Sequence, residues 1–204
     1  MERTTIRIGC IGDSITAGTG LKNPAQEAFP AQLEALLKNA TVFNFGNGGK
    51  TMRSDLGVDS YVNSVSYQAL MQNANDLDLV TIMLGTNDAY HAKGWTDDEK
   101  NKFQNDCRAL FATLAEKNPN MQFVLMNSPA CFGDKNNRYD MLPLRKLQSA
   151  LAVELCAVGY HTHFFDMYAV TQPLGDDFPD QLHPNKTAHR IMAEALCEYI
   201  QPIL

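Results

Sequence analysis

Ser14 stands where the sequence most clearly points to chemistry. The apolar run Ile6–Gly12 ends in a glycine, and Asp13 and Ser14 follow at once. Such a run is typical of a buried strand, and its glycine would end the strand just before the serine. Ligands and reacting groups collect at the carboxyl edge of an open parallel sheet. We therefore predict that Ser14 is a nucleophile, which would need a base within hydrogen-bond reach to accept its proton.

Short apolar runs alternate with longer amphipathic segments along the whole chain. This alternation is the signature of βαβ units and predicts an α/β fold with three layers, α/β/α, around a parallel sheet. We expect strands at 6–12, 41–45, 79–84, 122–126 and 161–166, and helices near 27–38, 64–74, 97–117, 143–158 and 184–200.

Four long polar segments follow predicted strands, and we expect them to be loops on the same edge of the sheet as Ser14. Loops longer than about 12 residues are uncommon and often functional. Their spacing therefore places the active site at this edge. The segments are 46–63, 86–96, 127–142 and 167–182.

Composition indicates one globular domain spanning 1–204, with 45% hydrophobic and 20% charged residues. A net charge of −6 argues against a nucleic-acid partner, which would require clustered Lys and Arg. The five cysteines are widely spaced and odd in number, as in a reducing compartment, so we expect a cytoplasmic protein. No signal peptide and no membrane-spanning run is recognisable. The sequence leaves the oligomeric state open.

Four short motifs, each after a predicted strand, together resemble the SGNH (GDSL-like) hydrolase family over the whole length of the chain. Each motif alone is weak, but all four in order make a strong signal. They are Gly12-Asp13-Ser14, Asn44-x-Gly46-x-x-Gly49-x-Thr51, Gly85-Thr86-Asn87-Asp88 and Asp180-Gln181-Leu182-His183.

The resemblance implies a flavodoxin-like sheet with strand order 2-1-3-4-5 and a serine esterase. It assigns Ser14 as nucleophile, His183 as base and Asp180 as the acid that orients the base. The N–H groups of Ser14 and Gly49 and the Asn87 side chain would form the oxyanion hole. No cofactor and no metal is implied.

General chemistry agrees with these assignments. A carboxylate beside an imidazole fixes its tautomer and stabilises its protonated form, and one tight turn can join Asp180 to His183. The tetrahedral oxyanion of ester hydrolysis needs preorganised donors, and losing one costs about 3–4 kcal/mol. A glycine such as Gly49 lets a backbone N–H approach without a side chain in the way.

Several of these residues also have purely structural interpretations. Ser14 alone would pass as a helix cap, and Asp13 and Asp88 are better explained as acceptors for backbone N–H groups in tight turns. His161 and His163 lack further ligands for a zinc site, so we interpret them as ordinary polar residues. We expect His189 at the surface, and Cys131 to be the most accessible cysteine.

Two competing motifs are incomplete. Gly49-Lys50-Thr51 resembles the end of a phosphate-binding loop, but Asn44 stands at the position of the first required glycine. The Gly-x-Ser-x-Gly elbow of α/β-hydrolases is also missing, because Gly12 and Thr16 flank Ser14. Neither a nucleotide triphosphatase nor the α/β-hydrolase fold is therefore favoured.

The substrate is predicted from the segments that would surround Ser14. Aromatic and amide side chains together suit a sugar, which offers a flat face and hydroxyl groups. We expect substrate contacts from Arg53, Tyr90, His91 and Trp95, and for Trp95 and Tyr90 a loop-anchoring role is the alternative. The other rim candidates are Tyr61, Asn63, Asn136, Asn137, Arg138 and Tyr139.

The resemblance is nearest to carbohydrate O-acetylesterases, so the expected substrate is a small-molecule or glycan ester carrying an acetyl group. Two alternatives stay open. One is a lysophospholipase or thioesterase that acts on acyl esters more broadly. The other, from a different class, is a carbohydrate-binding module on the same fold without catalysis.

Overall fold

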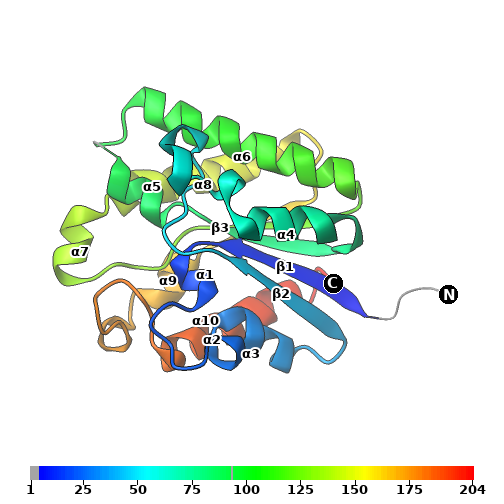
Figure 1. The fold of residues 1–204 in the computed structure, drawn as a ribbon, viewed down its shortest axis with the longest axis horizontal. Coiled ribbons are helices and arrows are strands. Elements are labelled where there is room, and N and C mark those ends of the chain that lie inside the picture. The colour runs from blue at the N-terminus through cyan, green and yellow to red at the C-terminus, as the bar shows by residue number, and fades with distance from the viewer. Residues whose placement is uncertain (1–4, 93) are drawn as a thin grey trace.

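The computed structural model describes residues 5–92 and 94–204, which form a five-stranded sheet between two layers of helices (Figure 1). The strands lie in the order β2-β1-β3-β4-β5, and all neighbours are parallel. The predicted fold class and strand order are confirmed. The strands are β1 Ile6–Gly12, β2 Ala40–Gly46, β3 Leu79–Met83, β4 Gln122–Met126 and β5 Thr162–Phe165.

Strand β1 lies inside the sheet, between β2 and β3. Ile8 and Cys10 belong to the core on one face of the sheet, and Ile11 belongs to the core on the other. A strand covered on both faces must be apolar in both directions, which explains why its sequence is nearly continuous in apolar residues. The register places Gly12 opposite both Gly46 and Met83, so β1, β2 and β3 end together at one edge.

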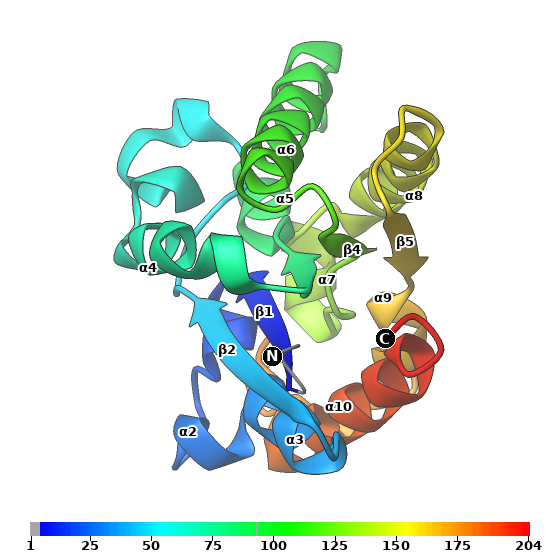
Figure 2. The ribbon, with the colours of Figure 1, turned by 90° about the vertical axis from the view of Figure 1, so that its right-hand side faces the viewer.

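The helices divide between the two faces of the sheet (Figures 1 and 2). Helices α4, α6 and α8 cover the face that contains Ile11, and α3 and α10 cover the face that contains Ile8. The helices are α1 Ser14–Ala17, α2 Pro24–Glu27, α3 Phe29–Leu36, α4 Val65–Asn73, α5 Thr86–His91, α6 Asp97–Lys117, α7 Gly133–Arg138, α8 Met141–Ala157, α9 Met167–Thr171 and α10 Lys186–Ile200.

Helix α6 shows how the sequence fixes an element locally. The Thr96 side chain accepts a hydrogen bond from the Glu99 N–H, and the Glu99 carboxylate accepts one from the Thr96 N–H. This reciprocal capping box satisfies donors that a helix start leaves unpaired. The apolar face of α6 is buried against the sheet, while its other face is charged. In residues 5–92 and 94–204, no helix is both long and apolar enough to cross a bilayer.

Three segments expected to be loops contain short helices instead. Helices α5, α7 and α9 have only five or six residues each. Their sequences lack the long apolar period that identifies an amphipathic helix, so the pattern could not reveal them. Helix α5 begins at the first residue after Gly85 and therefore presents Asn87 and Asp88 in its first turn.

The expectation that His189 lies at the surface is wrong. Its side chain is fully buried between α10 and α3, where its Nδ1 accepts the N–H of Phe29 at 3.1 Å. Phe29 is the first residue of α3. The residue before it, Ala28, has a methyl side chain that cannot accept a hydrogen bond from the helix start. His189 thus supplies the missing acceptor from 160 residues away. Burial lowers the pKa of His189 to about 4, so the ring is neutral.

The expectation for Cys131 is also wrong. Cys131 is buried, whereas Cys156 on α8 is exposed. The N–H of the preceding Ala130 donates to the Thr171 hydroxyl at 2.9 Å, which draws this segment toward the interior. Burial raises the pKa of the Cys131 thiol to about 12, so the group is a protonated, inert core side chain.

The buried neutral His189 predicts a loss of stability in mild acid. In the unfolded chain the imidazole takes up a proton below about pH 6.5, but the folded protein resists this down to about pH 4. Above about pH 6.5, the titration of His189 does not change the free energy of unfolding. As the pH falls from about 6.5 to about 4, the free energy of unfolding decreases. Linkage limits the effect to about 3 kcal/mol.

The measurement is urea unfolding of the wild type and His189→Gln at about pH 7.5 and pH 4.5. Glutamine can still accept the Phe29 N–H but does not titrate. We expect the wild type to lose more unfolding free energy than His189→Gln between the two conditions. Equal losses would show that His189 is not held neutral.

Candidate active site

The start of α1 brings the Ser14 hydroxyl to the carboxyl end of β1. The Asp13 carboxylate accepts the Ile15 N–H at 2.9 Å and so caps the helix. The path from strand to helix leaves no space at Gly12, where a Cβ atom would lie 2.0 Å from the Thr16 hydroxyl oxygen. Ser14 is the first helical residue, and its own N–H belongs to the turn that a helix leaves without intrahelical partners.

His183 and Asp180 meet Ser14 from the far end of the chain. The Ser14 Oγ lies 2.9 Å from His183 Nε2, and His183 Nδ1 lies 2.7 Å from Asp180 Oδ2. The other Asp180 oxygen accepts the N–H groups of Leu182 and His183, at 3.0 and 2.7 Å. The three side chains therefore form one continuous line of hydrogen bonds, with an oriented imidazole between hydroxyl and carboxylate.

The Asp180 carboxylate is ionised within this line. Partial burial acts to raise its pKa, but hydrogen bonds from the His183 ring and from two backbone N–H groups outweigh burial and lower the pKa. The side chain is still 54% exposed, whereas that of His183 is 21% exposed. The acid thus lies on the solvent side of the imidazole, and the serine on the inner side.

Gln181, which the sequence did not single out, closes the turn between Asp180 and His183. Its φ of 68° lies in the left-handed region, which residues other than glycine and asparagine rarely adopt. The Phe132 N–H donates to its carbonyl at 2.9 Å, and the Asp134 N–H donates to its side chain at 3.0 Å. The segment after β4 therefore holds this turn in place, a tertiary effect without a signal in the sequence.

The segment after β2 passes close to Ser14. A Cβ atom at Gly48 would lie 3.8 Å from the Ser14 Cβ, and the next residue, Gly49, has a φ of 74°. The Asn87 side chain in α5 donates one of its two N–H bonds to the Lys50 carbonyl at 2.9 Å. Across the described residues, neither the Ser14 N–H nor the Gly49 N–H donates to a protein acceptor. Both donors are therefore available to a ligand.

Two fully buried carboxylates support these segments. Asp13 caps α1, and Asp88 accepts the N–H groups of Met52 and Arg53 at 2.9 and 3.0 Å. Burial is the largest influence on both and raises each pKa to about 6, although the hydrogen bonds oppose it. Both aspartates are thus acceptors for backbone N–H groups, as their positions in the sequence predicted.

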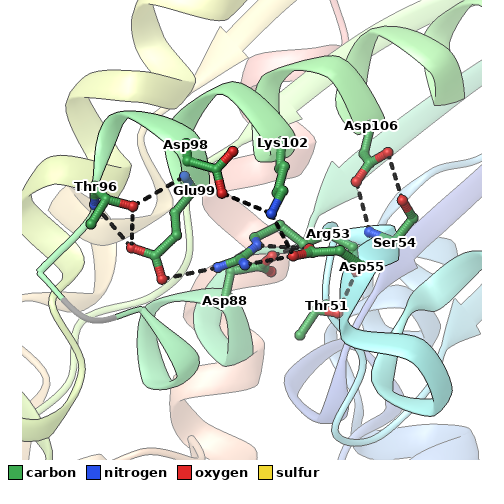
Figure 3. A network of polar contacts seen from close by, with 10 residues as sticks. All are labelled: Thr51, Arg53, Ser54, Asp55, Asp88, Thr96, Asp98, Glu99, Lys102 and Asp106. Carbon is green, nitrogen blue, oxygen red and sulfur yellow. Dashed lines mark hydrogen bonds and ion pairs between the residues drawn. The ribbon is translucent and has the colours of Figure 1, made fainter.

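Arg53 and Trp95 do not face a substrate. Trp95 is 1% exposed, and its indole N–H donates to the Asp140 carbonyl at 2.8 Å, so it anchors its loop. Arg53 is 5% exposed, and its guanidinium is committed to Asp55 and Glu99 (Figure 3). The expectation that these two residues contact substrate is corrected, because their donors are already used inside the protein.

Tyr90 and His91 lie nearer to solvent. Tyr90 is 37% exposed, and the Arg138 guanidinium carbon lies 4.2 Å from its ring centre. The Tyr139 ring lies 5.3 Å from the Tyr90 ring, and His91 lies 3.8 Å from the Asp59 carboxylate. Tyr90 follows Asn87 by three residues in α5, so the two side chains share one side of this short helix.

Two of the other predicted rim residues have their side chains hydrogen-bonded to nearby carbonyl groups. Tyr61 is buried, and its hydroxyl donates to the Phe45 carbonyl at 2.8 Å. The Asn63 side chain donates to the Gly57 carbonyl at 2.8 Å. By contrast, Asn136 and Asn137 are exposed on α7. The exposed aromatic surface beside Asn87 therefore consists mainly of Tyr90, with Arg138 and Tyr139 against it.

Known proteins resemble this chain in sequence and in fold. The chain is 27% identical over 225 residues to an acetylxylan esterase of Xylanibacter ruminicola, a match that covers 98% of this chain. The chain spans 44% of the length of that relative.

Solved structures also match over nearly the whole chain. An inhibitor-bound aryl esterase of M. smegmatis has a TM-score of 0.74 at 21% identity, covering 98% of this chain and 100% of the other. A family two carbohydrate esterase of Clostridium thermocellum, in complex with cellohexaose, has a TM-score of 0.73 at 20% identity, covering 100% of this chain and 66% of the other. Both share the fold described above.

A family-level match agrees with the geometry. Residues 10–191 match the GDSL-like Lipase/Acylhydrolase family, a range that contains Ser14, Gly49, Asn87, Asp180 and His183. Because this match covers most of the sequence, the chain belongs to the GDSL-like lipase/acylhydrolase family.

Proposed function

We propose that the protein is a serine esterase that removes small acyl groups, acetyl above all, from a carbohydrate. The observation that carries the proposal is the line of hydrogen bonds from Ser14 through His183 to Asp180. It joins a hydroxyl to a base and the base to an acid at the distances that nucleophilic catalysis requires.

The reaction would begin with attack of Ser14 Oγ on the ester carbonyl while His183 Nε2 accepts the hydroxyl proton. The resulting oxyanion would accept hydrogen bonds from the N–H groups of Ser14 and Gly49 and from the Asn87 side chain. His183 would then give its proton to the departing sugar oxygen, leaving an acyl ester on Ser14. Water, activated by His183 in turn, would release the carboxylic acid and restore the serine.

Two observations support a small acyl group on a sugar. The exposed side chains beside Asn87 are Tyr90 and Arg138, with the buried Tyr139 ring against Tyr90, and this surface suits a flat, hydroxylated ring better than a long acyl chain. A relative of this chain is described as an acetylxylan esterase. Tyr90 is the substrate contact that we retain from the sequence-based expectations, with His91 as its neighbour.

Ser14→Ala should abolish turnover because the nucleophilic oxygen is lost, with kcat for an aryl acetate falling about 10³-fold or more. The fold should be unchanged, because the Ser14 hydroxyl bonds to the His183 ring and not to a helix or strand of the core. Thermal unfolding and circular dichroism check this. A serine-directed phosphonate should label the wild type once, at Ser14. Ser149→Ala, at a half-buried serine in α8, is the matched control. Wild-type turnover in folded Ser14→Ala would refute the nucleophile, and an unlabelled folded protein would favour a binding module.

Asp180→Asn should lower kcat by about 10²–10⁴-fold, less than Ser14→Ala. The amide keeps the shape of the side chain but cannot stabilise the protonated imidazole, while the oxyanion donors remain. Asp176→Asn, in the same loop and outside the line of hydrogen bonds, should leave kcat near the wild-type value. A kcat for Asp180→Asn equal to that of this control would remove Asp180 from the mechanism.

Acyl length separates a deacetylase from a broader acyl hydrolase. With aryl esters of increasing length, we expect kcat/KM to be greatest for acetyl and about tenfold lower or more by butyryl. A maximum at octanoyl or beyond would instead support a lysophospholipase or thioesterase.

The sugar part of the proposal is tested with Tyr90. Tyr90→Ala should raise KM for an acetylated xylo-oligosaccharide while leaving KM for an aryl acetate unchanged, and Tyr90→Phe should retain most of the affinity because it keeps the ring. Equal KM values for the oligosaccharide in all three proteins would argue against a stacked sugar.

A further inference from the structure

The segment Gly49–Asp55 has little regular structure of its own, and side chains of α5 supply three of the hydrogen bonds that hold it. Thr51 also pairs with the backbone of Asp59 and Tyr61, and Ser54 donates to Asp106. The Asp88 oxygens accept the N–H groups of Met52 and Arg53, and the Asn87 side chain donates to the Lys50 carbonyl. The helix that carries the proposed donor Asn87 thereby also fixes the segment that begins with the proposed donor Gly49. Asn87 therefore links the two donors directly, and Asp88 holds the same segment two and three residues further on, at Met52 and Arg53.

Asp88 can hold two backbone N–H groups well only when it is ionised. A carboxylate accepts with both oxygens, whereas a neutral carboxyl uses one oxygen to carry its proton. Burial raises the pKa of Asp88 to about 6, and the two N–H groups and the positive charge of Arg53 oppose this. A full negative charge without exposure to water therefore requires a compensating cation nearby.

Arg53 is that cation, and the network around it is shown in Figure 3. Its Nε and Nη2 donate to the two Asp55 oxygens at 3.0 and 2.9 Å, and its Nη1 donates to Glu99 at 3.3 Å. Glu99 is itself fixed by the capping box that begins α6. The guanidinium is therefore held in one place by carboxylates from two elements, and it belongs to the residue whose own backbone N–H donates to Asp88.

In the part of the chain that the structure describes, other charged and titratable groups also lie around Asp88 and Arg53. From α6, the Cys107 thiol has its pKa raised to about 12 by burial and stays neutral. Lys102 lies at the outer side of the network, paired with Asp98 at 2.7 Å and with Asp55 at 3.3 Å. Asp106 accepts from the Ser54 N–H and hydroxyl. Arg53 is thus the cation whose charge lowers the pKa of Asp88.

We infer that Arg53 is a positioning residue for the oxyanion hole: its buried charge keeps Asp88 ionised, and ionised Asp88 holds the segment that presents the Gly49 N–H beside Ser14. The inference rests on the proposed function, in which Gly49 and Asn87 bind the oxyanion. Arg53 contacts no substrate. Its ion pair with Glu99 also ties the segment to α6, and the pH dependence described below separates that contribution from its effect on Asp88. A lysine would supply the charge without the fork that binds Asp55 with two parallel hydrogen bonds.

The kinetic test compares Arg53→Met, Arg53→Lys and the control Arg108→Met, an exposed arginine of α6 that pairs with Glu154. We expect Arg53→Met to lower kcat about tenfold or more, with KM nearly unchanged, because one donor to the transition state is misplaced. Its acid limb of kcat against pH should move up by about half a unit or more, since Asp88 loses the charge that favours ionisation. Arg53→Lys should restore most of the acid limb, and Arg108→Met should match the wild type.

A second measurement does not depend on esterase activity. In protein with ¹³C-labelled aspartate, the Asp88 carboxyl should titrate at higher pH in Arg53→Met than in the wild type, and the Gly49 amide signal should shift in ¹H–¹⁵N spectra. If Arg53→Met does not fold, Arg53→Gln removes the charge and keeps hydrogen-bond donors.

A folded charge-free variant with the wild-type Asp88 titration and Gly49 signal overturns the inference. A wild-type acid limb and kcat in that variant also overturn it, as does a loss of thermal stability with no change in the acid limb. An inactive wild type would defeat the proposed function alone, because the Asp88 titration would still decide the role of Arg53.

Discussion

The close packing of α1 onto the ends of β1 and β2 is the constraint on which the rest of the site depends. A Cβ atom at Gly46 would lie 2.3 Å from the Ala17 backbone nitrogen, and one at Gly12 would overlap Thr16. No side chain at either position could be accommodated without moving backbone. Because these strands end together, the serine at the start of α1 is placed where the turns after β2 and β3 also arrive.

Electrostatics at this edge combines an exposed acid with two buried ones. Asp180 lies at the surface and serves the imidazole, whereas Asp13 and Asp88 are buried and serve backbone N–H groups. Burying a carboxylate is unfavourable, and the protein offsets this with N–H donors, helix starts and, at Asp88, the guanidinium of Arg53. Burying these carboxylates lowers the free energy of unfolding, but it fixes loop segments that bury few apolar side chains.

Sequence reasoning worked where local pattern determines structure. The runs at 6–12, 97–117 and 122–126 appear with those bounds as β1, α6 and β4, because strand burial and helix capping are local properties. The four motifs also meet at one edge, because the carboxyl ends of all strands in a parallel sheet lie at the same edge.

It failed where a side chain is placed by distant partners. Trp95 and Arg53 look like rim residues in a polar segment, yet Asp140 and Glu99 draw them inside. His189 looks like a surface residue until α3 is found to need an acceptor for Phe29. Only tertiary structure supplies such partners.

The left-handed Gln181, held by Phe132 and Asp134, is also placed by distant partners. Its left-handed backbone costs about 1–2 kcal/mol, because the turn between Asp180 and His183 requires this conformation. Glycine or asparagine would lower this strain, but neither has the side-chain length of glutamine. The Gln181 carbonyl and side chain accept hydrogen bonds from Phe132 and Asp134, which connects the turn between Asp180 and His183 to the segment after β4. In the proposed esterase, the turn that joins acid and base and the segment after β4 would therefore move as one mechanical unit. A substitution in the segment after β4 that suited a new leaving group would then also change how firmly the base is held, so that selectivity and rate would not evolve independently.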